Sequence, residues 1–357
     1  MAKSSALTGA RIKVVGLGGS GCNAVTRMVR QQLHGVEFIA MNTDAQQLQI
    51  VEAGLRLQLG EKLTRGLGAG GDHIIGRRAA EESRDEIREA VSDADMIFIT
   101  AGMGGGTGTG SAAVVAEVAK QTGALTIAVV TRPFSFEGTH RAKTAEAGIK
   151  DLTNCVDTVI IIPNDRLFDL IDRKTTVDGA FRLADEVLHQ GVQAITEVIT
   201  VPGLINLDFA DVRTIMKNAG PAWMSIGRGT GQNRATDAAR AALASPLLDV
   251  TVKGAKGVLF NIAGNSSLTL YEVNSAAEVI RQAVDPKANV IFGVVLDNNM
   301  GADVRLTLIA TGFASRDSEA EREKEMSKVL KGIGDEELDL PSFTRHQGAT
   351  PQGAAIR

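Results

Sequence analysis

Residues 101–111 of the chain read AGMGGGTGTGS, and six of these eleven residues are glycine. The run follows a buried apolar stretch, DMIFIT (95–100), and precedes a helical pattern, so it joins a predicted strand to a predicted helix. Successive glycines let the backbone approach an anion and turn its N–H groups inward, and the helix behind adds its positive N-terminus. We therefore predict a phosphate-binding loop at residues 101–111.

This loop lacks the lysine of the common phosphate-binding motif, G-x-x-x-x-G-K-[ST]. Backbone amides, the helix dipole, the hydroxyl groups of Thr107 and Thr109 and an Mg²⁺ ion would then have to neutralise the phosphates. A structural turn needs one or two glycines rather than six, so a purely structural role explains this stretch poorly.

A second glycine-rich stretch, GLGGSG (16–21), follows the predicted strand RIKVVG (11–16) and also opens a helix. It fits the dinucleotide fingerprint G-x-G-x-x-G. Two interpretations stay open at this point, a nicotinamide-binding loop and a tight strand-to-helix turn without a ligand. The fingerprint also expects an acidic residue at the end of the second strand. The nearest candidate, Asp44, lies beyond the end of the predicted strand 36–42, which fits a ribose-binding acid poorly.

Composition excludes several classes of protein. Lys plus Arg number 38 and Asp plus Glu 42, and the net charge of −4 argues against nucleic-acid binding. Cys22 and Cys155 are too few for a disulfide framework, and the first residues contain no apolar signal segment. No stretch reaches the roughly 18–20 apolar residues that span a bilayer. The five histidines are scattered without metal-ligand spacing. We expect a soluble cytoplasmic protein that has no protein-bound metal and does not insert into membranes.

Strands and helices alternate in the first half of the chain, and the strands are nearly continuous apolar runs, which is typical of a parallel sheet covered on both faces. The expected strands there are 11–16, 36–42, 95–100, 125–131 and 157–163, with helices at 74–91, 110–122 and 138–152. A long helix is predicted at 177–199, before a mixed α/β unit. The strands expected in that unit start at about 221 and cover 259–264, 268–273, 288–297 and 303–313, with helices at 233–244 and 275–284. The last two strands are predicted to form a hairpin around NNMGA.

These patterns divide the chain into six segments. In order they are a disordered N-terminus, a nucleotide-binding domain, a central helix, a C-terminal α/β domain, a polar linker and a C-terminal peptide with its tail. The expected boundaries are 1–10, 11–176, 177–200, 201–314, 315–337 and 338–357.

Seven segments in order along the chain resemble the tubulin/FtsZ family of GTPases, and within it the bacterial cell-division proteins. They are VVGLGGSGCNAV, FIAMNTDAQ, GMGGGTGTG, RPFSFEG, IPNDRL, ADEVL and NLDFADVR. The resemblance covers about residues 11–313. It implies a tubulin-like α/β fold, GTP and GDP as ligands with Mg²⁺ held mainly by phosphates and water, and assembly with other copies of the chain head to tail. The implied role is GTP hydrolysis in the cytoplasmic division ring at mid-cell.

The resemblance also implies a set of nucleotide contacts. Asp185 and Asn164 would face the guanine, because a carboxylate suits its adjacent N1–H and N2–H₂ donors. Phe181 would pack on the base, and Glu137 and Arg141 would reach the ribose. From spacing alone, an exposed i,i+4 ion pair is the better explanation of Glu137 and Arg141. The remaining implied contacts are Gly19, Ser20, Gly21, Cys22, Asn23, Asp44, Ala69, Gly70, Gly71, Gly102, Met103, Gly104, Gly105, Gly106, Thr107, Gly108, Thr131 and Pro133.

Asp208 and Asp211 in NLDFADVR are three residues apart, so they share one face of a helix. From spacing alone, a helix cap with an acid in the first turn is the better explanation. The resemblance implies something else, namely that Asn206, Asp208 and Asp211 enter the next subunit's nucleotide site and act on the attacking water.

The segment LDLPSFTR (338–345) resembles the family's C-terminal peptide, which implies that residues 338–346 bind membrane-anchoring and regulatory division proteins. Thr344 stands where that peptide commonly has leucine. Two competing functions remain: a nicotinamide-dependent oxidoreductase that uses GLGGSG, and a non-hydrolysing structural member of the superfamily. The first leaves the loop at 101–111 unexplained, and the intact NLDFADVR argues against the second.

Overall fold

The computed structural model describes residues 9–170, 174–201, 205, 207–245, 252–297 and 300–313. The predicted linker (315–337) and the C-terminal peptide (338–357) lie outside the described residues, as do residues 1–8 and Asn206.

The first half of the chain alternates strands with helices. In order, its elements are β1 (Ile12–Leu17), α1 (Gly18–Arg30), β2 (Val36–Asn42), α2 (Ala45–Ile50), β3 (Leu55–Gln58), α3 (Glu61–Thr64), α4 (His73–Glu82), α5 (Arg84–Val91), β4 (Met96–Gly102), α6 (Thr107–Gln121), β5 (Leu125–Arg132), η1 (Ser135–Glu137), α7 (Thr139–Cys155), β6 (Thr158–Pro163) and η2 (Asn164–Leu170).

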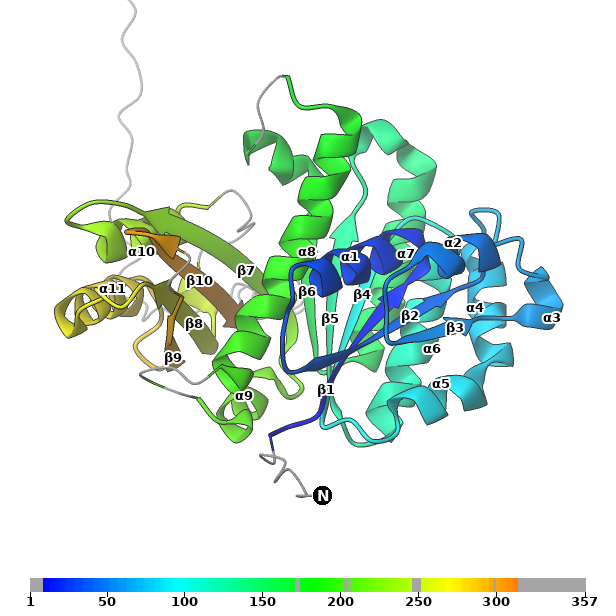
Figure 1. Ribbon diagram of the computed structural model, residues 1–357, viewed down its shortest axis with the longest axis horizontal. Coiled ribbons are helices and arrows are strands. Elements are labelled where there is room, and N and C mark those ends of the chain that lie inside the picture. Colours follow the sequence, from blue (N-terminus) through cyan, green and yellow to red (C-terminus); the bar gives the residue numbers. More distant parts are fainter. Residues whose placement is uncertain are drawn as a thin grey trace, which may run out of the picture. The chain divides into compact units, whose positions relative to one another are not determined.

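The second half begins with a long helix, as the sequence predicts. Its elements are α8 (Val177–Thr200), α9 (Phe209–Met216), β7 (Gly220–Gly229), α10 (Arg234–Leu243), η3 (Val252–Gly254), β8 (Gly257–Gly264), α11 (Leu270–Ala283), β9 (Asn289–Leu296) and β10 (Val304–Thr311). Figure 1 shows α8 between the N-terminal strands and strands β7–β10.

The described strands form one sheet in the order β3-β2-β1-β4-β5-β6-β7-β10-β8-β9. Neighbours from β3 to β7 are parallel, whereas β10 is antiparallel to both β7 and β8. The predicted parallel sheet of the first half is therefore confirmed. Every residue of β1 is buried, because helices cover both faces of this sheet.

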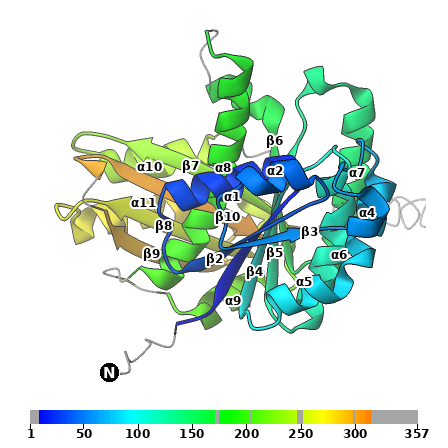
Figure 2. The ribbon, with the colours of Figure 1, turned by 45° about the vertical axis from the view of Figure 1, so that its right-hand side comes forward.

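Alternate side chains of the central strands enter two separate apolar clusters. Val14 of β1 packs with residues of α1 and α8, and Val15 packs with residues of α4–α7. Figure 2 shows α1 and α8 on one side of these strands and α5 and α6 on the other. These helices hold the carboxyl ends of the parallel strands in fixed places, and the loops that follow those ends build the site described below.

Three predictions of local structure are wrong. Residues 268–273 do not form a strand, because Thr269 caps α11 and exchanges hydrogen bonds with Glu272. The last two strands do not form a hairpin, since β8 lies between β9 and β10. The helix expected at 74–91 is broken at Ser83, whose hydroxyl accepts a hydrogen bond from the Gly60 amide at 3.0 Å.

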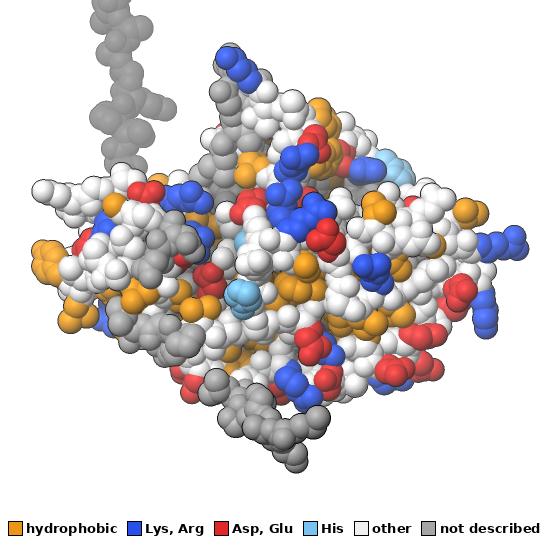
Figure 3. Space-filling view, in the orientation of Figure 1, with side chains coloured by type: hydrophobic (Ala, Val, Ile, Leu, Met, Phe, Trp, Pro, Cys, Tyr) orange, Lys and Arg blue, Asp and Glu red, His pale blue; other side chains and the backbone are white. Residues whose placement is uncertain are grey.

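On the face drawn in Figure 3, basic and acidic side chains are interspersed, so this face carries no large patch of one charge. This agrees with the small net charge of −4. Within the described part of the chain, no helix is both long enough and apolar enough to cross a membrane.

Candidate functional site

Two glycine-rich turns lie side by side at the carboxyl edge of the sheet. β1 leads into α1 at Gly18, and β4 leads into α6 at Thr107. Because β1 and β4 are paired in parallel, both turns leave the same edge. The two turns are far apart in the sequence, and the sheet brings them together.

Glycine is needed where the two turns touch. Gly18 has φ +67, and a Cβ built there would lie 2.8 Å from the amide nitrogen of Gly108. Gly19 and Gly105 differ, because a Cβ at either position would meet nothing within 4 Å. Gly18 therefore allows the two turns to pack against each other, whereas Gly19 and Gly105 face open space.

The N-termini of α1 and α6 present backbone donors at this space. Neither helix has a side-chain hydrogen bond at its N-cap among the described residues. Their first N–H groups have no acceptor within the helix, and each terminus carries partial positive charge. Thr107 adds a hydroxyl, which lies 2.6 Å from the Thr43 hydroxyl. This end of the site can bind an anion without a lysine.

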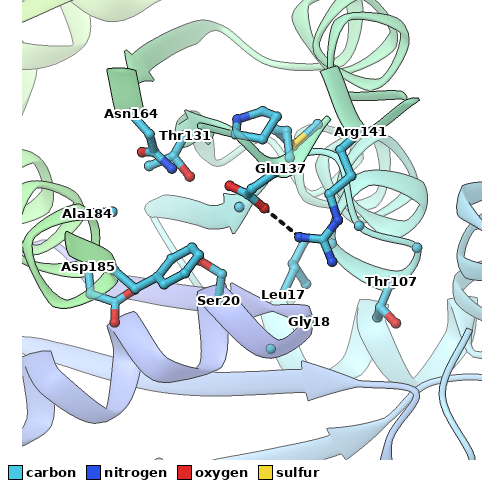
Figure 4. Close-up of a pocket in the computed structure, with 18 residues that line it drawn as sticks. Leu17, Gly18, Ser20, Thr107, Thr131, Glu137, Arg141, Asn164, Ala184 and Asp185 are labelled. Carbon is cyan, nitrogen blue, oxygen red and sulfur yellow. Dashed lines mark hydrogen bonds and ion pairs between the residues drawn. The ribbon is translucent and has the colours of Figure 1, made fainter. Parts of the chain in front are cut away.

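The turns form one end of a cavity of about 270 Å³ (Figure 4). Its walls come from β1, α1, β4, α6, β5, η1, α7, η2 and α8. The lining residues are Leu17, Gly18, Gly19, Ser20, Gly102, Met103, Gly105, Gly106, Thr107, Gly108, Thr131, Pro133, Glu137, Arg141, Asn164, Phe181, Ala184 and Asp185. Of these, the sequence did not indicate Leu17, Gly18 or Ala184, which are immediate neighbours of residues that it did indicate.

A second cavity adjoins the first and shares Gly105 and Arg141 with it. Gly70, Gly71 and Gly104 line this second cavity rather than the first. Histidines were not among the predicted contacts, yet its other lining residues are Asp72, His73 and His140. Glycine-rich backbone thus continues past the anion-binding end.

Five predicted contacts line neither cavity. Cys22 is buried and its thiol points to the carbonyls of Gly16 and Met41; burial raises the pKa of this thiol to about 12. Asp44 caps α2 by accepting a hydrogen bond from the Gln47 amide at 3.0 Å. The remaining three are buried Gly21, exposed Asn23 and buried Ala69.

The opposite end of the cavity holds Asn164 and Asp185 (Figure 4). Burial raises the pKa of the Asp185 carboxyl to about 7, against the positive charge of Arg27. Asn164 is 4% exposed, and its Oδ1 has no hydrogen-bond partner among the described residues. The Asn164 amide therefore has unused hydrogen-bonding capacity that a planar ligand could satisfy, and the Asp185 carboxyl is a second polar group at the same end of the cavity.

Phe181 lies beside these polar groups and is partly exposed. Its ring meets Phe134 edge-on, with centroids 5.6 Å apart. Such a ring packs well on the face of a base. The far end of the cavity thus offers one aromatic face and two polar side chains, which suits a nucleobase.

Glu137 and Arg141 form an ion pair on the wall between the two ends (Figure 4). Glu137 also accepts a hydrogen bond from the Phe134 amide at 2.9 Å, and its side chain is only 10% exposed. The Arg141 side chain is 55% exposed. The glutamate is thus fixed by the fold, while the guanidinium has donors to spare for a ligand.

Asp208 and Asp211 do not line the cavity. They form a capping box at the start of α9, in which Asp208 Oδ1 accepts from the Asp211 amide at 2.8 Å and Asp211 Oδ2 accepts from the Asp208 amide at 3.2 Å. The cap expected from their spacing is therefore present. Asn206 lies outside the described residues.

The described residues contain no group of three His, Cys, Asp or Glu side chains that could hold a metal ion.

Comparison with known proteins gives two family matches. The model described as the GTPase domain of the Tubulin/FtsZ family matches residues 11–172. The model of the C-terminal domain of the FtsZ family matches residues 220–314.

Solved structures agree with these matches. An empty FtsZ dimer from M. jannaschii is 47% identical, with a TM-score of 0.84 over 87% of this chain and 90% of that chain. A point mutant of M. jannaschii FtsZ is 48% identical, with the same TM-score of 0.84, over 87% and 93%. CetZ2 from Haloferax volcanii, solved as a GTPγS-bound protofilament, has a TM-score of 0.74 at 18% identity over 91% and 99%, and this likeness shows a shared fold.

Proposed function

The chain belongs to the tubulin/FtsZ family of GTPases and has its tubulin-like fold, and from this premise we propose that it hydrolyses GTP only where two copies meet head to tail. One observation supports this proposal above the others. The cavity joins the two glycine-rich turns at one end to Asn164 and Asp185 at the other, while Asp208 and Asp211 do not line it. A second copy could bring its acids to the glycine-rich end.

In this proposal each end of the cavity binds one part of GTP. Asp185 and Asn164 read the guanine edge, and Phe181 packs on its face. Glu137 and Arg141 face the ribose. The amides of residues 105–108 and of the α1 N-terminus hold the phosphates, and Mg²⁺ bound to those phosphates lowers their charge. Asp44 and residues 69–71, of which Gly70 and Gly71 line the adjoining cavity, would lie nearer the terminal phosphate.

The chemistry would then occur at the junction. Asp208 and Asp211 of the neighbouring copy, with Asn206, position or polarise the water that attacks the terminal phosphate. A head-to-tail contact uses two different surfaces of each copy, so it generates an open filament. The relatives point the same way, since the solved FtsZ is a dimer and the solved CetZ2 is a protofilament.

We further propose that these filaments form the cytokinetic ring at mid-cell. The division into a GTP-binding domain (11–176), a central helix (177–200) and a C-terminal domain (201–314) belongs to this proposal. So does recruitment of membrane-anchoring and regulatory division proteins by residues 338–346.

The test is GTP turnover per subunit as a function of protein concentration. We expect turnover near zero in dilute protein and a rise once filaments sediment. Asp211→Asn keeps a carbonyl oxygen for the α9 cap but loses the charge, so it should bind GTP normally and lose about 10²–10⁴-fold in turnover. Mixed with wild type it should depress activity. Turnover that stays constant down to concentrations where only monomer is present would refute the shared site.

A further inference from the structure

Near its C-terminal end, α8 is joined to β10 by a partly buried ion pair. Arg305 Nη2 lies 3.4 Å from Glu197 Oε2, and the two side chains are 16% and 15% exposed. Gln193 Nε2 donates to the other carboxylate oxygen of Glu197 at 2.5 Å. The carboxylate is therefore held between its own helix and a strand that lies 108 residues further along the chain.

Each member of this pair depends on the other. Burial raises the pKa of the Glu197 carboxyl, and the positive charge of Arg305 opposes that rise. Removing Arg305 alone would leave a partly buried carboxylate without its cation. Replacing both charges by apolar side chains avoids this penalty, because a buried ion pair often contributes little net stability.

Strand β9 contacts both the end of α8 and Ile205, which follows it. Gly293 of β9 packs so close to α8 that a Cβ there would lie 3.3 Å from Val198 Cγ1. Three residues before Asp208, the carbonyl of Ile205 accepts a hydrogen bond from the Val294 amide of β9 at 3.1 Å. Beyond the acids, Val212 is fully buried. The acids therefore stand on a segment anchored at both ends.

We propose that Glu197 and Arg305 are a positioning pair for GTP hydrolysis, which holds the end of α8 on the C-terminal strands so that Asp208 and Asp211 reach the neighbouring copy's nucleotide correctly. The inference rests on the proposed junctional GTPase. Neither residue lines the cavity, and α8, with 24 residues, spans about 36 Å. Asp185 lies about three turns, or about 18 Å, before Glu197 on this helix, so a shift at the Glu197 end displaces the acids while leaving Asp185 in place.

Misplacement of a catalytic group by about 1 Å can cost on the order of 100-fold in rate while ligand binding is unaffected. The double variant Glu197→Met, Arg305→Met should thus fold with a melting temperature near that of wild type, bind GDP within about twofold, and sediment with GTP. Its turnover per sedimented subunit should fall by about 10-fold or more. Exchanging the charges, Glu197→Arg with Arg305→Glu, should restore part of the lost turnover.

A matched control is Lys13→Met with Asp93→Asn, which removes a different ion pair. In this pair the buried Lys13 of β1 meets Asp93 in the turn before β4. This control should turn over GTP like wild type. Arg305→Lys is the milder variant: it keeps the charge, loses the planar donor group, and should show a smaller loss of turnover at unchanged GDP affinity. It decides the question if the double Met variant fails to fold.

Two results would overturn the positioning role. In the first, the double Met variant turns over GTP at the wild-type rate per sedimented subunit. In the second, its turnover falls only as much as its GDP affinity falls. The failure of the underlying proposal looks different. In that case wild type itself would show no rise of turnover with concentration, whatever the state of the ion pair.

Discussion

Asp185 should make guanine nucleotide affinity depend on pH. Burial raises the pKa of this carboxyl to about 7 in the nucleotide-free protein. The guanine edge offers two adjacent N–H donors, so it binds the ionised carboxylate and not the acid. Binding must therefore remove a proton from the fraction of molecules in which Asp185 is protonated.

The size of the effect follows from this pKa. With a pKa of about 7 and a much lower value in the complex, the dissociation constant is multiplied by about 11 at pH 6, about 2 at pH 7 and about 1.1 at pH 8. Affinity should thus rise roughly tenfold from pH 6 to pH 8 and then level off. The sign is that of a carboxyl that binds ligand only when ionised.

The assay is GDP binding by isothermal titration at constant ionic strength and Mg²⁺, with protein diluted below the assembly concentration. Asp185→Asn is the control, because its amide does not ionise and every other titrating group, including the nucleotide phosphate, remains. The variant should bind more weakly, and the ratio of the two dissociation constants should carry the tenfold pH dependence. A ratio that is flat from pH 6 to pH 8, or that changes in the opposite direction, would refute the assignment of Asp185 to the base.

Three further predictions concern the fold. The folded-state pKa of Asp185 lies above its ordinary 3.8, so its contribution to stability is lost as pH rises from about 4 to about 7. At pH 8 the free energy of unfolding of nucleotide-free Asp185→Asn, measured by chemical denaturation, should therefore exceed that of wild type by about 2–4 kcal/mol. Equal stability of the two proteins at pH 8 would contradict the raised pKa. Gly110→Ala should destabilise the protein by about 1–3 kcal/mol, because the new Cβ would lie 2.1 Å from the His73 carbonyl oxygen. Gly105→Ala should leave the melting temperature unchanged and weaken GDP binding, because its Cβ would meet nothing within 4 Å. The reverse pattern would contradict this geometry. Removing residues 314–357 should leave GTP-dependent sedimentation intact, because the compact unit ends at Phe313, and loss of filaments would place the tail in the assembly surface.

The sequence alone predicted the glycine-rich end of the cavity. The phosphate binding proposed there uses backbone amides, and glycines after a buried strand are a local pattern that needs no tertiary information. Gly105 and Thr107 could be indicated from residues 101–111 alone. The base end could not, because Phe181 resembles any core residue at helical spacing. Only the resemblance to a family indicated it.

Local patterns also failed where a better local signal was present. Residues 268–273 contain alternating apolar side chains that suggest a strand, yet Thr269 and Glu272 stand at capping-box spacing and begin α11. The hairpin between β9 and β10 failed for a different reason. Strand pairing is a contact between distant segments, and here β8 takes the place beside β10 that a hairpin would need.

What the sequence by itself determined is therefore the set of elements with strong local signals: the buried parallel strands, the two glycine turns and the cap at Asp208. Tertiary structure decided which of them meet. It placed the turns of β1 and β4 at one sheet edge and brought Asp185, on α8, to the cavity that those turns begin. It also left Asp208 and Asp211 outside that cavity. The physical reason is that capping and turn formation act over three or four residues, whereas a binding site is made of contacts whose partners are fixed only when the sheet and the helices that cover it have packed.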